Sequence, residues 1–281
     1  MSRRARLHAL TAANVDDLLR AFRLPDRAFV RLLLRPPARR FADQLQHLDG
    51  LVATDGLAAG ARWALRTFTR RLTTVGRERV PSSGPLLAVS NHPGLTDVMA
   101  LVLALEQRDD LLIVALDRPV LRSLPAIASR LLWVSGTDRL ALIQRARRHL
   151  HQGGALLTFP AGTIEPDPSL REAQEALQHW SPSLSVLGRG VDGLQVLPLA
   201  VGGVISPAAL ASAAARRIDD RKDREFTAAT LQVLFRRYRD TDTRVLVGEP
   251  FAPGSDVTAD VRRRMRELFT RLAVSGVGGT V

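Results

Sequence analysis

The sequence has 281 residues, which is enough for one large domain or for one domain with a helical extension, and we favour the second arrangement. Its apolar fraction of 46% and charged fraction of 24% are those of an ordinary folded protein, so a largely disordered chain is excluded. The absence of cysteine excludes disulfides and thiolate zinc sites, and it suits a reducing compartment.

The chain is strongly basic, with 40 Lys and Arg residues against 28 Asp and Glu residues and a formal net charge of +12. Such a charge attracts polyanions, among them nucleic acid, anionic lipid surfaces and acidic carrier proteins. No stretch approaches the roughly 18 to 20 consecutive apolar residues that cross a bilayer, and no apolar run follows the basic start. We therefore expect a cytoplasmic protein that meets a membrane, if at all, from its inner face.

Residues 1–75 are predicted to form a basic helical region. Helical patterns cover 15–24, 25–34 and 39–52, with Pro36 and Pro37 ending the second, and a fourth covers 56–72. The fourth combines an apolar stripe, flanking arginines and Trp63, which is typical of an interfacial membrane helix and equally of a surface helix. The stripe consists of Leu57, Ala61, Leu65, Phe68 and Leu72.

From Val80 onward the pattern alternates between strands and helices. This alternation predicts an α/β domain, over residues 76–275, whose sheet is covered by helices on both faces. The predicted strands are 86–89, 111–115, 131–134, 155–159, 195–201 and 244–247. The predicted helices are 97–107, 119–129, 139–152, 169–180, 207–218, 224–239 and 258–272.

A histidine and an aspartate flank the turn after the first of these strands. Pro93 and Gly94 break the chain between His92 and Asp97, so the two side chains can meet although residues five apart on a regular helix diverge. A carboxylate beside an imidazole orients it and stabilises its protonated form, which is the base half of a catalytic triad. The alternative is a histidine that merely caps or hydrogen-bonds the turn.

No nucleophile is evident beside this pair. The sequence lacks Gly-x-Ser-x-Gly and has no cysteine, which disfavours a covalent acyl-enzyme. The histidine would then activate a substrate hydroxyl directly.

Four blocks, in order, resemble those of the glycerolipid acyltransferases, the lysophosphatidate acyltransferase-like enzymes with the signature Asn-His-x-x-x-x-Asp. The resemblance spans about residues 77 to 270, and the first and third blocks are the more specific. The blocks are Asn91-His-Pro-Gly-Leu-Thr-Asp97 with the residues before it, Trp133 to Arg139, Thr158 to Thr163, and Val196 to Val201.

The resemblance implies a mixed sheet flanked by helices, with a helical N-terminal extension. It implies an acyltransferase of phospholipid or other lipid synthesis that moves a fatty acyl group from acyl-coenzyme A or an acyl carrier protein to a hydroxyl acceptor. His92 would be the general base and Asp97 its partner, with no cofactor and no metal. The expected substrate-binding residues are Asn91, Arg139, Phe159, Pro160, Gly162 and Thr163.

Two of these assignments have further arguments and alternatives. From its chemistry, the turn from Phe159 to Thr163 can supply backbone N–H donors to an oxyanion, because Gly162 permits close approach. Arg139 resembles the family's phosphate-binding arginine, but it is equally placed to be a surface arginine in the first turn of a helix. An anionic membrane surface is the expected partner, whereas nucleic acid is not, because few aromatic residues are available for stacking.

The third block departs from the family pattern at two positions. Ala161 stands where glutamate is usual and Ile164 where arginine is usual, and in the family those side chains help to hold the polar head of the acceptor. Glu165 is a candidate replacement for the missing glutamate. The departures also motivate an alternative function, namely an inactive basic protein on the same fold that binds lipid or nucleic acid.

Overall fold

The computed structural model describes residues 2–134, 139–170 and 173–277, which divide into two compact units. The first unit comprises residues 1–70, 118–129 and 205–241, and the second comprises 71–117, 130–204 and 242–281. The boundary near residue 70 lies close to the predicted one at 75. However, two later segments of the chain complete the first unit, which sequence alone did not indicate.

The second unit is built on a seven-stranded sheet with the order β1-β7-β6-β2-β5-β3-β4. Its strands pair in parallel except β6 and β7, which are antiparallel, so the predicted mixed α/β sheet is confirmed. The strands are β1 (Arg71–Val75), β2 (Leu86–Ser90), β3 (Leu112–Leu116), β4 (Leu131–Val134), β5 (Ala155–Thr158), β6 (Gln195–Gly202) and β7 (Asp242–Val247).

Strand β2 lies near the middle of the sheet, and all five of its residues are buried. A strand covered on both faces carries a continuous apolar run, which is why the sequence predicted it correctly. Strand β1 was instead taken for the end of a helix. It is an edge strand that pairs only with β7, and its residues alternate between exposed and half-buried.

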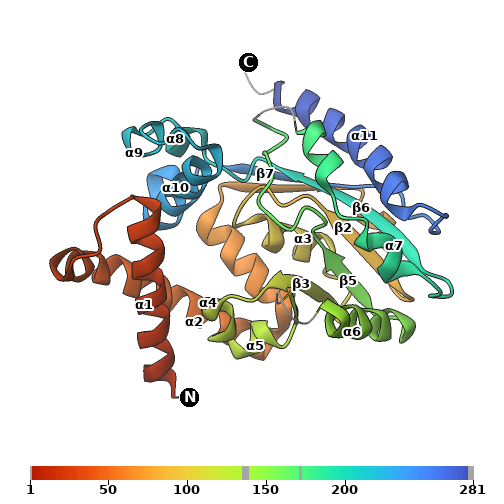
Figure 1. Cartoon of the computed structure of the whole chain (residues 1–281), viewed down its shortest axis with the longest axis horizontal. Helices are drawn as coiled ribbons and strands as arrows, with labels where there is room; N and C mark the ends of the chain where they lie inside the picture. The colour runs from red at the N-terminus through yellow and green to blue at the C-terminus, as the bar shows by residue number, and fades with distance from the viewer. Residues whose placement is uncertain (1, 135–138, 171–172, 278–281) are drawn as a thin grey trace. The chain divides into compact units, whose positions relative to one another are not determined.

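Helices cover both faces of this sheet, as Figure 1 shows. Leu87 and Val89 of β2 join a cluster with residues of the helices on one face, while α3 packs on β6 and β7 and contributes nothing to that cluster. The helices of the unit are η1 (Arg77–Arg79), α3 (Asp97–Ala104), α6 (Arg139–His151), η2 (Gln174–His179), α7 (Ser183–Gly188) and α11 (Val257–Val277).

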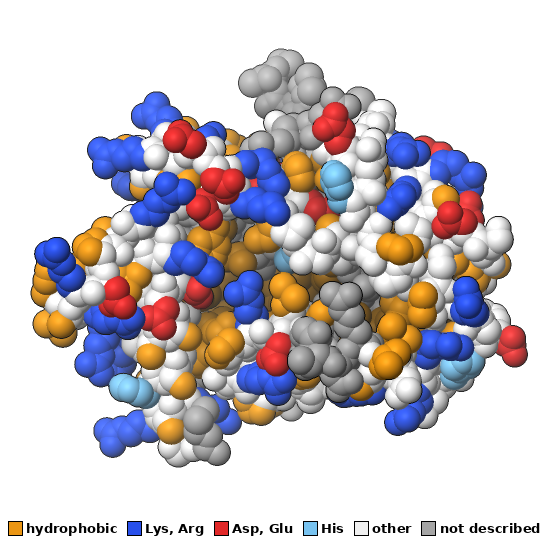
Figure 2. All heavy atoms as spheres, in the orientation of Figure 1, with side chains coloured by type: hydrophobic (Ala, Val, Ile, Leu, Met, Phe, Trp, Pro, Cys, Tyr) orange, Lys and Arg blue, Asp and Glu red, His pale blue; other side chains and the backbone are white. Residues whose placement is uncertain are grey.

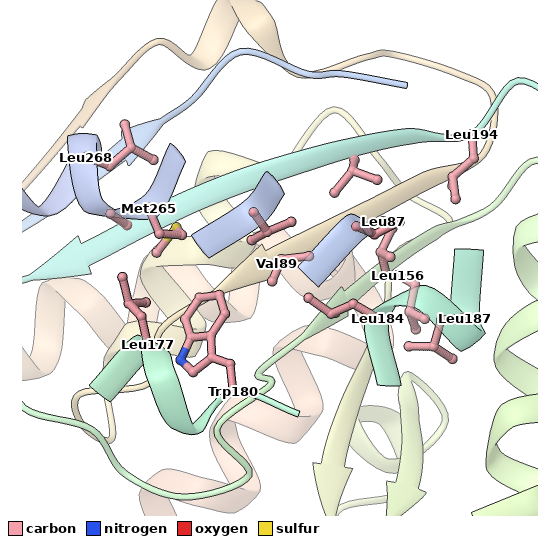
Figure 3. Packing of buried hydrophobic residues seen from close by; sticks show 14 of the residues in the cluster. Leu87, Val89, Leu156, Leu177, Trp180, Leu184, Leu187, Leu194, Met265 and Leu268 are labelled. Atoms are coloured by element: carbon pink, nitrogen blue, oxygen red, sulfur yellow. The ribbon is translucent and has the colours of Figure 1, made fainter. Parts of the chain in front are cut away.

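Trp180 is the largest fully buried side chain of this cluster. Figure 3 shows its ring among Leu177, Val89 and Leu184. The helix predicted over 169–180 is wrong in its described part, which holds the 3₁₀ helix η2. A 3₁₀ helix has three residues per turn, so Leu177 and Trp180, three residues apart, both reach the core.

The first unit is helical. Its helices are α1 (Arg3–Ala21), α2 (Ala28–Phe68), α4 (Pro119–Arg122), α5 (Pro125–Ala128), α8 (Pro207–Leu210), α9 (Ala213–Arg216), α10 (Arg221–Leu234) and η3 (Arg236–Tyr238). Its core joins Val15, Leu18 and Leu19 of α1 to Val30 and Ala38 of α2.

Helix α2 corrects one prediction. It continues through Pro36 and Pro37, which were expected to end it. Proline has no backbone N–H, so Pro36 and Pro37 cannot donate to the carbonyls of Leu32 and Leu33, four residues earlier. Leu32 and Leu33 are exposed, so water can hydrogen-bond to these carbonyls instead. The break comes at Gly56, whose φ of 85° lies in the left-handed region that glycine tolerates.

The middle of the apolar stripe predicted over residues 57–72 is buried within α2, and its last residue, Leu72, lies in β1. Leu65 and Phe68 are 4% and 8% exposed, and the half-buried Trp63 stacks edge-on against His47 and Phe68. This stripe therefore does not form an exposed membrane-binding face.

Candidate active site

The first motif lies on a strand, a turn and a helix of the second unit. Strand β2 ends at Ser90, a loop of six residues follows, and α3 begins at Asp97. The loop thus follows the carboxyl end of a central parallel strand, the usual place for sites in open α/β sheets.

His92 and Asp97 are hydrogen-bonded, with 2.8 Å between His92 Nδ1 and Asp97 Oδ2. Asp97 is fully buried, and its carboxylate also accepts the backbone N–H groups of Gly94 and Val98 at 3.0 and 2.6 Å. An ionised carboxylate only accepts hydrogen bonds, so Nδ1 carries the proton and Nε2 keeps the lone pair. The arrangement makes Nε2 the nitrogen able to accept a proton.

The surroundings raise the pKa of His92 above its ordinary 6.5. Burial disfavours the imidazolium and acts to lower this pKa, but the charge and hydrogen bond of Asp97, together with the charge of Glu165, outweigh it. His92 is therefore a stronger base than a free histidine.

Asn91 is not placed to bind a substrate, contrary to the prediction. Its side chain is fully buried, its Nδ2 donates to the carbonyl of Val201 at 2.8 Å, and its Oδ1 accepts the N–H of Val201 at 2.9 Å. Both ends of the amide are thus bonded to β6. Asn91 fixes the start of the His92 loop against the neighbouring strand.

The third block follows β5, the strand beside β2, and one of its residues reaches His92. The ring of Phe159 lies 4.9 Å from that of His92, centroid to centroid. Pro160 is buried and its carbonyl accepts the N–H of Ser181 at 3.0 Å, whereas Gly162 and Thr163 are exposed.

Gly162 closes the turn and is not a free oxyanion donor. Its φ of 62° is left-handed, which explains the glycine, and its N–H donates to the carbonyl of Phe159 at 3.1 Å. Oxyanion donors from this turn must therefore come from other residues.

The second block contributes no described side chain near the site. Residues 135–138 and the side chain of Arg139 lie outside the described part of the chain. The backbone of Arg139 begins α6. The role predicted for Arg139 therefore stays a prediction.

Glu165 is the residue whose position sequence reasoning missed. It is 3% exposed, its Oε2 accepts the N–H of His92 at 3.0 Å, and its own N–H donates to the carbonyl of His92 at 2.9 Å. Its Oε1 accepts the indole N–H of Trp180 at 2.6 Å. A carboxylate in a loop rich in proline was the available signal, but its partner is 73 residues away in sequence.

Residues 71–201 match the model of the family described as Acyltransferase. The matched stretch is similar to that family and comprises 131 of the 281 residues, just under half of the chain. The match contains β1, β2, the His92 loop and the loop after β5, and it confirms the glycerolipid acyltransferase resemblance drawn from the four blocks.

One solved structure and the curated proteins give further comparisons. The crystal structure of the 1-acyl-sn-glycerophosphate (LPA) acyltransferase PlsC from Thermotoga maritima shares 16% identity and a TM-score of 0.48. The match covers 99% of this chain and 95% of that one. Among curated proteins, none matches this chain significantly.

Across residues 2–134, 139–170 and 173–277, no helix combines the length and the apolar character that crossing a bilayer requires.

Proposed function

We propose that the chain transfers a fatty acyl group from a thioester to a hydroxyl acceptor, with His92 as general base and Asp97 as its partner. The observation that carries this proposal is the hydrogen bond from His92 Nδ1 to the buried Asp97 Oδ2, 2.8 Å long, which directs the lone pair to Nε2. Acyl-coenzyme A and acyl carrier protein are the candidate donors. Both are anionic and suit a chain of net charge +12.

The reaction needs one proton to move twice. Nε2 of His92 takes the proton of the acceptor hydroxyl as its oxygen attacks the thioester carbonyl carbon. The tetrahedral intermediate then expels the thiolate by breaking the C–S bond, and the imidazolium returns the proton to the sulfur. Asp97 stabilises the imidazolium in between, because a buried carboxylate interacts strongly with a charge hydrogen-bonded to it.

The acceptor should carry a less polar head than glycerol 3-phosphate or lysophosphatidate. Ala161 packs against the core cluster and Ile164 is half-buried, so neither position offers the carboxylate or the guanidinium that would hold a hydroxyl or a phosphate. Glu165 does not replace them, because both of its oxygens are bonded within the protein. A lysolipid of another class or a lipophilic alcohol fits this description.

We place the membrane contact of this enzyme at the corner between α1 and α2. Phe29, Leu32 and Leu33 are 59%, 67% and 70% exposed. In Figure 2 apolar and basic side chains lie together at the left margin, where Figure 1 draws this connection. The large exposed fractions mark these apolar side chains, rather than Trp63 and Phe68, as those that enter a bilayer.

The charges around this corner favour an anionic surface. Arg27 and Arg35 are exposed, whereas Asp26 and Asp16 are paired with Arg31 at 2.5 and 2.7 Å. Juxtaposed exposed arginine and apolar side chains bind anionic headgroups and the boundary of the acyl chains together. The proposed location is accordingly peripheral, at the inner face of the cytoplasmic membrane.

Transfer of labelled acyl groups from acyl-coenzyme A to a panel of lysolipids and alcohols tests the function. His92→Ala should lower the rate by about 10² to 10⁴, the usual contribution of a general base. His151→Ala, which removes an exposed histidine at the end of α6, should leave the rate unchanged. A parent protein that binds anionic vesicles but transfers no acyl group would favour the inactive lipid-binding alternative instead.

A further inference from the structure

Glu165 and His92 are joined by two hydrogen bonds, one between their backbones and one from the His92 backbone to the Glu165 side chain. The Glu165 N–H donates to the His92 carbonyl at 2.9 Å, and the His92 N–H donates to Glu165 Oε2 at 3.0 Å. The loop after β5 is therefore hydrogen-bonded to the backbone of His92, whereas Asp97 is hydrogen-bonded to its imidazole ring.

The site suits a carboxylate and not an amide. Glu165 is 3% exposed, and each of its carboxylate oxygens accepts a hydrogen bond. The donors are the backbone N–H of His92 and the indole N–H of Trp180. Such donors offset part of the desolvation of a buried carboxylate, and the part that remains raises the pKa of Glu165. A glutamine would turn its own N–H₂ group toward one of these donors, which would leave buried donors unpaired.

Trp180 connects Glu165 to the core of the unit. The indole is 1% exposed and packs in the cluster seen in Figure 3, while its Nε1–H reaches Glu165 Oε1 at 2.6 Å. A tightly packed ring has few alternative positions, so the carboxylate that it holds is also fixed. Trp180 therefore fixes Glu165, and Glu165 in turn holds the backbone of His92.

We propose that Glu165 is a positioning residue of the acyl-transfer site, whose carboxylate holds the backbone of His92 and adds negative charge beside its ring. This inference rests on the proposed function. It gives Glu165 a role that differs from binding the acceptor, since the acceptor has no access to a carboxylate bonded on both oxygens.

Two charged groups act on His92 from the elements packed around it. Asp97 does so from α3 and Glu165 from the loop after β5, and both favour the imidazolium. Removing the charge of Glu165 should therefore lower the pKa of His92, and with it the acid limb of the rate profile, to lower pH.

The test compares Glu165→Gln with Asp167→Asn. Asp167 is a matched control because it is 1% exposed in the same loop and accepts the N–H groups of Gly203 and Val204, both at 2.9 Å. It is not among the groups that shift the pKa of His92. Both variants lose a buried carboxylate, but only one of these carboxylates touches His92.

The readouts are the pKa of His92 from NMR titration and the split between kcat and KM. Glu165→Gln should lower the pKa of His92 and reduce kcat about 10- to 100-fold, since misplacing a catalytic group by about 1 Å costs up to about 10² in rate. KM for the acyl donor should stay near the parent value. Asp167→Asn should leave the pKa of His92 unchanged, whatever its effect on stability.

Trp180→Phe keeps the test informative if Glu165→Gln does not fold. It removes one donor to the carboxylate while keeping an aromatic ring in the core, and it should move the pKa of His92 in the same direction by a smaller amount. An unchanged pKa of His92 in these variants overturns the proposal, whether or not the protein transfers acyl groups. A lowered pKa in a protein without transferase activity would instead reject the proposed function and leave the Glu165 contact standing.

Discussion

The side chain of Asn91 and the backbone of Val201 exchange two hydrogen bonds, of 2.8 and 2.9 Å, across adjacent strands β2 and β6. Asn91 directly precedes His92, and both Asn91 and Val201 are fully buried. It extends the pairing of the two strands beyond Ser90 and Leu199, their last paired residues. The base of the proposed reaction therefore starts from a fixed point of the sheet.

Asn91→Ala should lower both stability and rate. It leaves the N–H and the carbonyl of Val201 buried without partners, and each unsatisfied buried group costs about 1–3 kcal/mol. It also removes the anchor that holds the His92 loop. Urea unfolding and the acyl-transfer rate measure the two effects. Asn14→Ala is the matched control, because Asn14 is buried and donates to the carbonyl of Ala38 in the other unit. A rate as high as that of the control would show that the loop does not need this anchor.

Asp97→Asn should reduce kcat by about 10² to 10⁴, because an amide neither fixes the Nδ1–H tautomer nor stabilises the imidazolium as a carboxylate does. The pKa of His92 should fall, since Asp97 contributes to raising it. Steady-state kinetics across pH measure both changes. Asp256→Asn removes a carboxylate that accepts the N–H of Ala259 at the start of α11 and should leave the pH profile unchanged. Parent-like kinetics in Asp97→Asn would remove the Asp97 part of the mechanism.

Stability should fall as the pH rises from about 5 to about 7.5. Burial raises the pKa of Glu165 from 4.5 to about 7, against the opposing hydrogen bonds of Trp180 and His92. Across that window the folded state keeps a proton that the unfolded state has released, so raising the pH favours unfolding. The raised pKa of His92 acts in the same direction, because its stabilising effect is present below pH 6.5 and is lost as the pH rises through the folded pKa.

Urea unfolding at the two pH values measures this dependence. The Glu165 contribution is on the order of 3 kcal/mol at most, from about 1.4 kcal/mol per pKa unit. Glu165→Gln should lose this part of the slope. The same slope in the parent and in Glu165→Gln would contradict the shifted titration of Glu165.

Replacing Phe29, Leu32 and Leu33 together with serine should weaken binding to anionic vesicles by more than about tenfold, since burying each apolar side chain contributes about 1.5–3 kcal/mol. These side chains are exposed, so the fold should be unaffected. Sedimentation with vesicles of anionic and of neutral lipid measures the change. The control is Leu140→Ser, which removes an equally exposed leucine, 74% exposed, from α6. Equal losses in both variants would place the membrane contact elsewhere.

Ala161→Glu combined with Ile164→Arg should shift selectivity toward a phosphate-bearing acceptor. The pair restores a carboxylate and a guanidinium, and a hydrogen bond to a charged group is worth about 1.5–3 kcal/mol. The ratio of kcat/KM for glycerol 3-phosphate and for a lipophilic alcohol measures the shift. Val186→Arg, which adds an arginine at an exposed position of α7, serves as the control for charge. Efficient acylation of glycerol 3-phosphate by the parent protein would place head-group recognition on other basic residues.

The sequence alone determined what depends on neighbouring residues. The apolar run of β2, the Pro93 and Gly94 turn and the position of Asp97 at the start of α3 are encoded within 12 residues, from Leu86 to Asp97. Local spacing was therefore enough to bring an imidazole and a carboxylate together. Buried strands were recognised for a similar reason, since residues covered on both faces of a sheet must be apolar.

Only the tertiary structure decided the rest. Strand β1 escaped prediction because an edge strand needs no apolar run, and the stripe on α2 has the same pattern whether it faces a membrane or a core. The partners of Asn91 and Glu165 lie 110 and 73 residues away along the chain. A buried amide or carboxylate is recognisable only by the donors and acceptors that surround it, and here the sheet and the loop after β5 supply them. Local sequence therefore predicted the base and its first carboxylate, whereas folding brought the second carboxylate to the same histidine.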